Sequence, residues 1–199
     1  MKNKINIAFD LDGCLIDMVT PIKRLLLEIH GVELKDEDPK YDQFDLTIPT
    51  GLSSKELWKI FRMVYKEVKT IPIYFGATEL LTKLYEKTNE PPLILTARPL
   101  DVANDTYAVV KRMMGKIPFS LILKHPNANK AQYLSGYEYY VEDRRKNALE
   151  LNEAGFKIPL VRKNYNYIPE ITYKSPDIWY IDGIYSLIPH IEYFISDGN

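Results

Sequence analysis

The chain has 199 residues, a formal net charge of −1 and one cysteine, Cys14. This length suits one sizeable domain, with room for a subdomain inserted into it. The nearly neutral charge gives no overall attraction to nucleic acid or membranes, and a single cysteine excludes an internal disulfide framework and a Cys-rich zinc site. Because no apolar run approaches a membrane span and the first residues lead straight into a strand, we expect a cytoplasmic protein with no membrane partner.

The first apolar stretch, residues 5–9, ends abruptly in two acids, Asp10 and Asp12, with a glycine directly after them. Such a run is typical of a buried strand, and two buried carboxylates are costly unless a cation or a ligand compensates them. Ligands of open α/β sheets bind just beyond the carboxyl ends of the strands. We therefore interpret the two acids as part of a site. The alternative is an ordinary strand-to-turn exit, where Asp and Gly are common.

Two helices are predicted in the stretch that follows the acidic turn. The first begins near Pro21, which suits an N-terminal turn, and stops at Gly31, which suits a C-terminal cap. The second follows a serine cap at Ser53 or Ser54, and its apolar residues recur with helical spacing. That apolar stripe comprises Leu57, Ile60, Phe61, Val64 and Val68.

The rest of the chain alternates between strands and helices. Helices are predicted at about 76–88, 101–114, 146–154 and 184–196, with a short one near Lys130. Strands are predicted at 93–96, 119–123, 137–141, 158–161 and 178–181. This alternation predicts an α/β fold with a parallel sheet and right-handed crossovers. Because residues 17–75 are too long for a crossover, we interpret them as a small helical cap inserted into a core of residues 1–16 and 76–199.

Four polar features fall at the ends of predicted strands or on the loops beyond them. They are Asp10 with Asp12, Thr96, Lys130, and Glu142 with Asp143. Converging at one sheet edge, these groups suit phosphoryl transfer with Mg²⁺, a cation that prefers hard oxygen ligands. Thr96 can hydrogen-bond a phosphoryl oxygen, and Lys130 can neutralise both the phosphate and the nucleophile. Asp10 can attack phosphorus to give an aspartyl-phosphate intermediate, while Asp12 protonates the leaving oxygen and then activates water.

The four features resemble the motifs of the haloacid dehalogenase (HAD) superfamily. The matching residues are Asp10-Leu11-Asp12-Gly13, Leu95-Thr96-Ala97-Arg98, Lys130 and Val141-Glu142-Asp143. The resemblance implies a Rossmann-like core, with Asp10 as nucleophile and Asp12 as the general acid/base that phosphatase branches carry. It implies Mg²⁺ bound by the carboxylates of Asp10 and Asp143 and by the backbone carbonyl of Asp12. Glu142, where an Asp-Asp pair is frequent, would then lie behind the ligands, with Asn147 within reach of the metal's water shell.

A narrower resemblance is to the 5′(3′)-deoxyribonucleotidase-like branch, which has a small helical cap after its first motif. The similar segments are 51–53 before a Trp-containing helix, 71–72 before Gly76-Ala77, 142–147 and 161–166. The segment Pro-Ile-Tyr-Phe-Gly at 72–76 departs from the Pro-Ile-Pro-Gly form of that branch. The resemblance implies hydrolysis of mononucleotides.

Candidate phosphate contacts adjoin the second and third motifs. Ala97 and Arg98 follow the motif threonine and are predicted to bind substrate. Arg98 can bind phosphate or orient a carboxylate, or alternatively form a salt bridge with the Glu142 pair. Lys124 competes with Lys130 for the role of catalytic amine, and we favour Lys130 because it opens a helix after the loop.

Candidate base-stacking residues are aromatic and lie in the cap. We favour Tyr41 and Phe44, which stand in irregular sequence of the kind that often carries binding residues. A second aromatic group has helical spacing and is interpreted as core, with a stacking surface as the alternative. It comprises Trp58, Phe61 and Tyr65.

The sequence therefore predicts a Mg²⁺-dependent phosphomonoesterase, most like a 5′(3′)-nucleotidase that hydrolyses nucleoside monophosphates. Because a small cap leaves the site partly open, the alternative enzyme is a phosphatase of polynucleotide ends, like the phosphatase half of a polynucleotide kinase. A third hypothesis is a non-catalytic HAD-like protein that binds a phosphorylated ligand. The second acid argues against it, because a binding protein needs no proton donor.

Overall fold

The computed structural model describes residues 3–34, 46–125, 128–163, 166 and 175–197 of the chain. Its centre is a parallel sheet in the order β4-β3-β2-β5. These strands are β2 (Ile7–Phe9), β3 (Leu93–Thr96), β4 (Ser120–Leu123) and β5 (Tyr139–Val141). The α/β fold with a parallel sheet that the sequence predicts is confirmed.

Two further strands extend the sheet beyond β5. They are β6 (Ile158–Val161) and β7 (Ile178–Ile181), which pair in parallel. Parallel bridges from Tyr139 to Lys157 and from Glu142 to Leu160 join β5 to β6. Because β2, β3, β5 and β6 run in one direction, all of them deliver the residues that follow them to the same edge of the sheet.

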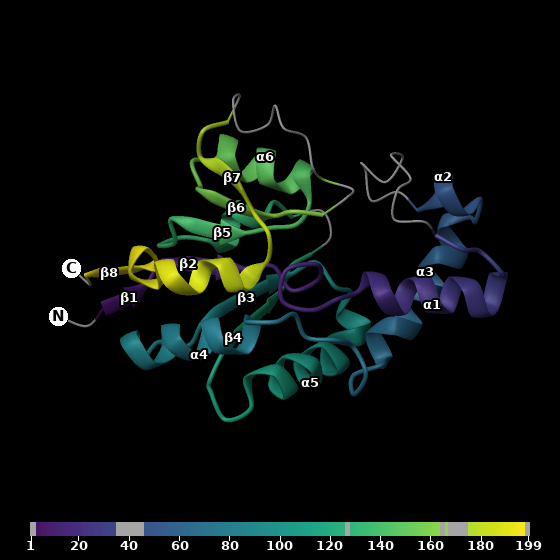
Figure 1. The fold of residues 1–199 in the computed structure, drawn as a ribbon, viewed down its shortest axis with the longest axis horizontal. Coiled ribbons are helices and arrows are strands. Elements are labelled where there is room, and N and C mark those ends of the chain that lie inside the picture. The colour runs from purple at the N-terminus through teal and green to yellow at the C-terminus, as the bar shows by residue number, and fades with distance from the viewer. Residues whose placement is uncertain (1–2, 35–45, 126–127, 164–165, 167–174, 198–199) are drawn as a thin grey trace.

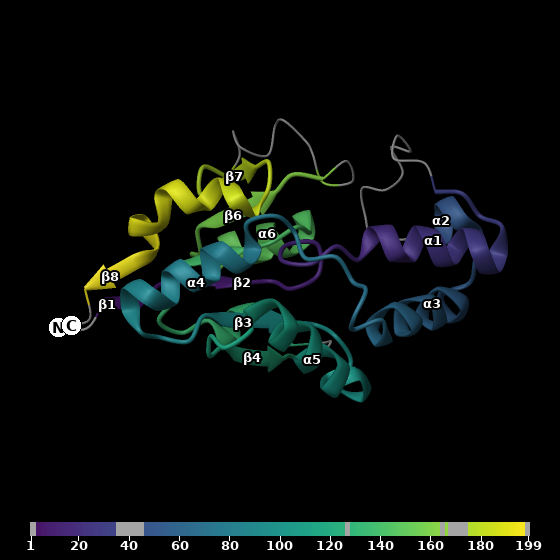
Figure 2. The same cartoon turned by 60° about the horizontal axis from the view of Figure 1, so that its bottom comes forward.

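Helices cover both faces of the sheet, as Figures 1 and 2 show. One face packs on α4 (Ala77–Thr88), α5 (Ala103–Met114) and the 3₁₀ helix η4 (Ile184–Phe194), and the other on α6 (Arg145–Glu153). Strand β2 shows the alternation that this layering requires: Ile7 and Phe9 belong to the first apolar cluster and Ala8 to the second. All three residues are fully buried, so the run is apolar on both faces.

The C-terminal segment corrects the predicted helix at 184–196. Its helix η4 has 3₁₀ geometry, contains Pro189 and is kinked at His190 (φ −108°, ψ 16°). Proline lacks a backbone N–H and clashes with the preceding turn, which explains why a regular α-helix does not form here. The chain then forms β8 (Ile195–Asp197), which pairs antiparallel with β1 (Asn3–Ile5).

The first predicted strand is also interrupted. Asn6 lies between β1 and β2, and its N–H donates to the Phe194 carbonyl (3.0 Å) while its own carbonyl accepts from Glu138 and Tyr139 (2.8 and 3.0 Å). The backbone groups of Asn6 thus join η4 to the start of β5. The neighbouring β1–β8 pair lies at the end of the molecule opposite α1 and α3 (Figure 1).

Three helices lie beyond the carboxyl edge of the sheet, on the right of Figure 1. They are α1 (Val19–His30), the short α2 (Thr47–Thr50), in a stretch predicted to be irregular, and α3 (Ser54–Lys66). Helix α3 begins with a capping box in which Ser53 and Glu56 each accept a backbone hydrogen bond from the other, so the predicted serine cap is confirmed.

Two linkers run side by side from the sheet to these helices. The N–H of Asp17 donates to the Pro72 carbonyl (2.9 Å), and the N–H of Tyr74 donates to the Leu15 carbonyl (3.0 Å). Arg112 of α5 donates to the carbonyls of Lys69 (2.5 Å) and Ile71, which ties the second linker to the core. The three helices are therefore joined to the sheet through one paired connection.

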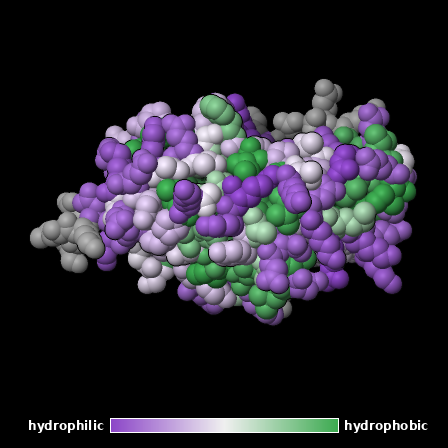
Figure 3. Space-filling view, turned by 90° about the horizontal axis from the view of Figure 1, so that it is seen from below, coloured by the Kyte–Doolittle hydropathy of each residue, from purple (hydrophilic) through white to green (hydrophobic). Residues whose placement is uncertain are grey.

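The surface view in Figure 3 shows apolar residues in small groups separated by hydrophilic ones. Among the described residues, no helix is both long enough and apolar enough to cross a membrane.

Candidate functional site

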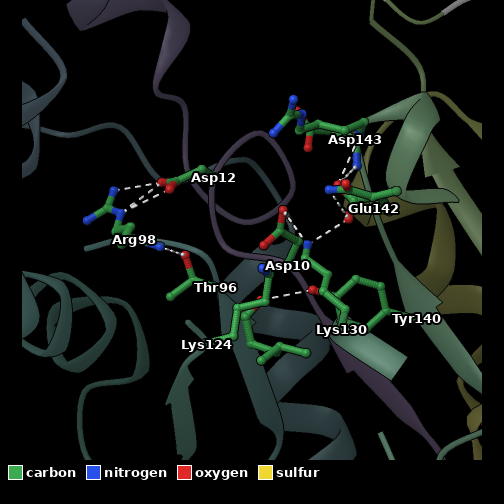
Figure 4. Close-up of polar contacts among 12 residues, drawn as sticks. Asp10, Asp12, Thr96, Arg98, Lys124, Lys130, Tyr140, Glu142 and Asp143 are labelled. Atoms are coloured by element: carbon green, nitrogen blue, oxygen red, sulfur yellow. Dashed lines mark hydrogen bonds and ion pairs between the residues drawn. The ribbon is translucent and has the colours of Figure 1, made fainter. Parts of the chain in front are cut away.

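Asp10 stands at the end of β2, where its N–H donates to the Val141 carbonyl (3.0 Å). Its side chain is nearly buried, and the Lys130 ammonium lies 3.2 Å from its Oδ2 (Figure 4). Burial raises the pKa of Asp10 to about 7, although Lys130 acts in the opposite direction. The carboxylate is therefore held in a desolvated position that a further positive charge would favour.

Glu142 directly follows β5 and is completely buried. Its Oε1 accepts from the N–H groups of Asp143 (3.1 Å) and Arg144 (3.0 Å), and its Oε2 accepts from Lys130 Nζ (2.7 Å) and Asn147 Nδ2 (3.1 Å). Burial alone would raise the pKa of Glu142, but Lys130 and these hydrogen bonds outweigh it and the pKa is lowered. Glu142 is thus ionised, and it holds the Lys130 ammonium close to Asp10 at the end of β2.

A cluster of possible metal ligands forms next to Glu142. One ligand atom from each of Asp10, Cys14 and Asp143 lies within 4.8 Å of the others. Gly13 (φ +79°) lets the turn approach closely, since a Cβ there would lie 2.0 Å from Asp143 Oδ2. Burial, followed by the neighbouring carboxylates, raises the pKa of the Cys14 thiol, so it stays protonated. Two buried carboxylates are left as the charged donors, which fits a hard divalent cation.

The backbone of Asp143 is held by Asn166. The Asn166 amide donates to the carbonyls of Asp143 (2.6 Å) and Val161 (2.7 Å), and its oxygen accepts from the Lys163 N–H (2.8 Å). Asn166 is almost fully buried. Sequence reasoning missed this role, because only the fold brings the loop after β6 to Asp143.

Asp12 faces away from this cluster and pairs with Arg98. Arg98 Nε lies 3.1 and 3.0 Å from the two Asp12 oxygens, and Nη2 donates to Oδ1 at 2.7 Å. The Arg98 side chain is fully buried, whereas that of Asp12 is 25% exposed. The guanidinium carbon lies 4.5 Å from the centroid of the Tyr65 ring on α3, and Nη2 lies 3.1 Å from Met18 Sδ.

Of the interpretations open for Arg98, the structure shows the one in which it orients a carboxylate. The alternative prediction, a salt bridge from Arg98 to the Glu142 pair, is wrong, because Nε and Nη2 of Arg98 contact the Asp12 carboxylate. Arg98 still borders the cavity described next, and its buried Nη1 has no hydrogen-bond partner among the described residues.

A cavity of about 400 Å³ opens between the sheet edge and α3. Its floor includes Asp10, Asp12, Thr96 and Lys130. Its opposite wall is aromatic and comes from Trp58, Phe61 and Tyr65 of α3, with ring centroids 5.8 Å apart for the first pair and 6.3 Å for the second.

The aromatic wall corrects the core interpretation of the stripe on α3. Tyr65 is buried as predicted, but Trp58 is 51% exposed and borders the cavity. The predicted helix is correct, but the aromatic side of its stripe faces the cavity rather than another helix. The favoured stacking residues Tyr41 and Phe44 lie outside the described residues.

Solved structures that share this architecture include hydrolases of the HAD superfamily. A HAD-like hydrolase from Streptococcus pneumoniae matches with a TM-score of 0.65 at 19% identity, over 94% of this chain and 97% of that one. A predicted phosphoglycolate phosphatase from Haemophilus somnus matches with a TM-score of 0.63 at 18% identity, over 92% and 96%. The chain has the HAD fold. The resemblance to the HAD superfamily that the four motifs indicated is confirmed at the level of the fold.

Sequence comparison gives one curated relative of this HAD-fold chain. A protein from Clostridium acetobutylicum named nucleotidase is 26% identical over 170 residues, which is 83% of this chain and 84% of that protein. No known family profile matches the sequence.

The remaining predicted residues lie around the carboxyl edge of this HAD fold. The Thr96 hydroxyl accepts from the Arg98 N–H (3.3 Å), and Ala97 lines the cavity. Lys124 donates to the carbonyls of His125 (3.1 Å) and Ala128 (2.8 Å), whereas Lys130 reaches Asp10. The geometry thus places Lys130, rather than Lys124, at the acid. Asn147 contacts Glu142 rather than the possible metal ligands.

Proposed function

We propose that the protein is a phosphomonoesterase in which Asp10 is the nucleophile and Asp12 the general acid and base. The observation that carries this proposal is the buried Asp10 carboxylate, 3.2 Å from Lys130, with a second, partly exposed carboxylate two residues along on the same cavity. A nucleophile and a separate proton donor are the two groups that stepwise phosphate-ester hydrolysis needs.

In the first step, an Asp10 oxygen forms a bond to phosphorus while the bond from phosphorus to the leaving oxygen breaks. Asp12 gives its proton to that leaving oxygen. In the second step, Asp12 takes a proton from water, whose oxygen attacks phosphorus and breaks the bond to Asp10. Inorganic phosphate leaves and both carboxyl groups return to their initial state. Lys130, fixed by Glu142, and the Thr96 hydroxyl hold the phosphoryl oxygens in both steps.

The residues present fit a Mg²⁺ ion, which we propose as the cofactor. Asp10 and Asp143 would hold it, because they are the buried charged oxygen donors of the cluster and Gly13 packs directly against Asp143. Asn166 keeps Asp143 in place through its backbone carbonyl. When bound, the cation neutralises charge on the phosphoryl oxygens and on the acids around them.

A nucleoside monophosphate is the substrate that we propose for this phosphatase. The floor of the cavity carries carboxylates and the Lys130 ammonium, and its opposite wall is aromatic. A phosphate could therefore bind at the floor and a base at the wall. Trp58 offers a half-exposed ring for stacking. The name of the Clostridium acetobutylicum relative points to the same substrate class. We treat α1–α3 as the cap that carries this wall and thus discriminates between substrates.

Phosphate release tests the function. The protein is assayed with Mg²⁺ against nucleoside monophosphates, sugar phosphates and end-phosphorylated oligonucleotides. We expect turnover of nucleoside monophosphates and its loss, by several orders of magnitude, in Asp10→Asn, because removal of a nucleophile eliminates the first step. The matched control is Asp177→Asn, an exposed aspartate outside the cavity, which should keep wild-type activity.

Each other outcome identifies a different function. Release from oligonucleotide ends alone would favour the polynucleotide-end phosphatase. Tight binding without turnover would favour the non-catalytic phospho-ligand binder. An active Asp10→Asn protein would overturn the assignment of the nucleophile.

A further inference from the structure

A second cavity, of about 340 Å³, lies beside the first. Ala97, Lys130, Arg144 and Asn147 line both cavities, so the two adjoin each other. The second one continues along the loop before η3 (Lys130–Tyr133) and along the first turns of α6. We call it the basic pocket.

Positive side chains dominate the wall of the basic pocket. Of the described residues that line it, one is acidic, Glu150, and four are basic: Lys124, Lys130, Arg144 and Lys146. Glu150 lies 3.8 Å from Lys146 in a pair on the surface of α6, with side chains 49% and 80% exposed. Such an exposed pair is weak and can open at little cost, which leaves Lys146 available to a ligand.

Lys124 and Lys130 bring two ammonium groups to the inner part of this pocket. The charge of Lys130 is met by Asp10 and Glu142, on the side of the first cavity. Lys124 is largely buried, and its ammonium donates to the carbonyl oxygens of His125 and Ala128. Burial, and then repulsion from Lys130, lower the pKa of Lys124. An anion between these ammonium groups would relieve that repulsion.

The backbone of α6 also makes the electrostatic potential of the basic pocket more positive. Arg144 is the N-cap of α6, a helix of nine residues, so the positive end of its dipole faces the pocket wall formed by Arg144, Lys146 and Asn147. Asn129 and Asn147 also line the pocket. Unlike the first cavity, the basic pocket has no aromatic side chain among the described residues that line it, so its chemistry suits an anionic group rather than a base.

We propose that the basic pocket binds a second phosphate group of the substrate, so that a nucleotide with two separate phosphates is preferred over a monophosphate. One phosphate would lie at Asp10 and the other near Lys124 and Lys146, on the far side of Lys130. This proposal rests on the proposed phosphatase function and specifies its substrate class. The second phosphate could be a monoester, as in a nucleoside 3′,5′-bisphosphate, or the diester of a short oligonucleotide.

Equilibrium binding tests the proposal without turnover. The Asp10→Asn protein keeps every basic residue of the pocket, and its affinity is measured for a deoxynucleoside 5′-monophosphate, the matching 3′,5′-bisphosphate and a 5′-phosphorylated dinucleotide. We expect the bisphosphate to bind about tenfold more tightly than the monophosphate, as charge-assisted hydrogen bonds to a second phosphate would give. If the dinucleotide also binds more tightly, the pocket accepts a diester; if it does not, the pocket requires a monoester.

Two lysine variants, each combined with Asp10→Asn, show where the preference arises. Lys146→Met changes an exposed side chain and should not affect folding, whereas Lys124→Met also removes hydrogen bonds within its loop. Both should remove most of the preference for the bisphosphate. The matched control is Lys111→Met, an exposed lysine on α5 outside the pocket, which should keep it.

The outcomes separate this proposal from the proposed function. Equal affinity for the monophosphate and bisphosphate, no binding of either, or a preference that survives in both lysine variants would overturn the second phosphate site. A preference for the bisphosphate in a wild-type protein that hydrolyses no phosphate ester would support the site and overturn the phosphatase function.

Discussion

At the scale of single residues, the pairing of Asp12 with Arg98 is the contact that most affects the proposed chemistry. Three contacts of 2.7 to 3.1 Å fix the carboxylate against a fully buried guanidinium. Arg98 also packs on Tyr65, so this one side chain contacts both Asp12 and helix α3. We regard Arg98 as a positioning residue, because it acts on the reaction through Asp12.

Replacing Arg98 with methionine should lower kcat more than it raises KM. Methionine fills part of the space but cannot hold Asp12, so the proton donor loses its orientation. The variant should also be destabilised, by about 1–3 kcal/mol, because Asp12 loses a buried charged hydrogen-bond donor. Steady-state kinetics with a nucleoside monophosphate and urea unfolding measure the two effects.

A surface ion pair provides the control for this substitution. Arg62 lies 3.1 Å from Asp101, with both side chains more than half exposed. Arg62→Met should change the free energy of unfolding by less than about 1 kcal/mol and leave kcat unchanged. If Arg98→Met raised KM alone, Arg98 would be a substrate-binding residue, as the sequence predicted, rather than a positioning residue.

At the scale of secondary-structure elements, α3 has two different faces. Leu57, Ile60 and Val64 are buried, whereas Trp58 and Phe61 form the aromatic wall of the cavity. The capping box at Ser53 fixes the start of the helix and therefore the direction in which each side chain points. The helix thus combines a buried apolar stripe with an adjacent aromatic surface that lines the cavity.

Trp58→Ala should raise KM for a nucleoside monophosphate by about tenfold, because stacking of one base on an aromatic ring contributes about 1–3 kcal/mol. The KM for a sugar phosphate such as ribose 5-phosphate should stay within about twofold, since it has no base. Phe75→Ala is the matched control, as Phe75 is 82% exposed and does not line the cavity. An equal rise in KM for both substrates would show that Trp58 supports the cavity rather than a base.

The elements near the carboxyl edge of the sheet were predictable from local sequence, whereas the long-range contacts were not. Short apolar runs followed by polar residues are enough to predict β2, β3 and β5 and the residues after them. Arg98 and Asp12 are 86 residues apart in the sequence, so only the fold determines which carboxylate Arg98 contacts. The exposure of Trp58 similarly depended on whether α3 faced a helix or a cavity.

The C-terminal segment was likewise only partly predictable from local sequence. Helical spacing at 184–196 predicted a helix, but the sequence alone did not show that Ile195–Asp197 would meet Asn3–Ile5 and extend as a strand. Pro189 was the available local signal, since it disfavours a regular helix. Antiparallel pairing of the two ends is a tertiary contact that single-segment patterns do not report.

At the scale of the whole molecule, the proposed metal site connects two parts of the sheet. Asp10 follows β2 and Asp143 follows β5, and both are buried beside Cys14, whose raised pKa keeps it uncharged. Two carboxylates close together in a buried position repel each other, and the raised pKa of Asp10, about 7, reflects chiefly this burial. A cation bound between them should therefore stabilise the native state against the unfolded chain, which has no such site.

Addition of Mg²⁺ to the EDTA-treated protein should accordingly raise its Tm. At a concentration of about 100 times Kd, the native state gains about 2.7 kcal/mol. This corresponds to a rise of about 5–10 °C for a chain of this size. Differential scanning fluorimetry in EDTA and in Mg²⁺ measures the shift, with Na⁺ at equal ionic strength to exclude general screening. Asp143→Asn should abolish most of the rise, while Asp177→Asn, outside the cluster, should keep it. An equal rise in wild type and Asp143→Asn would place the stabilising cation elsewhere and remove Asp143 from the proposed ligands.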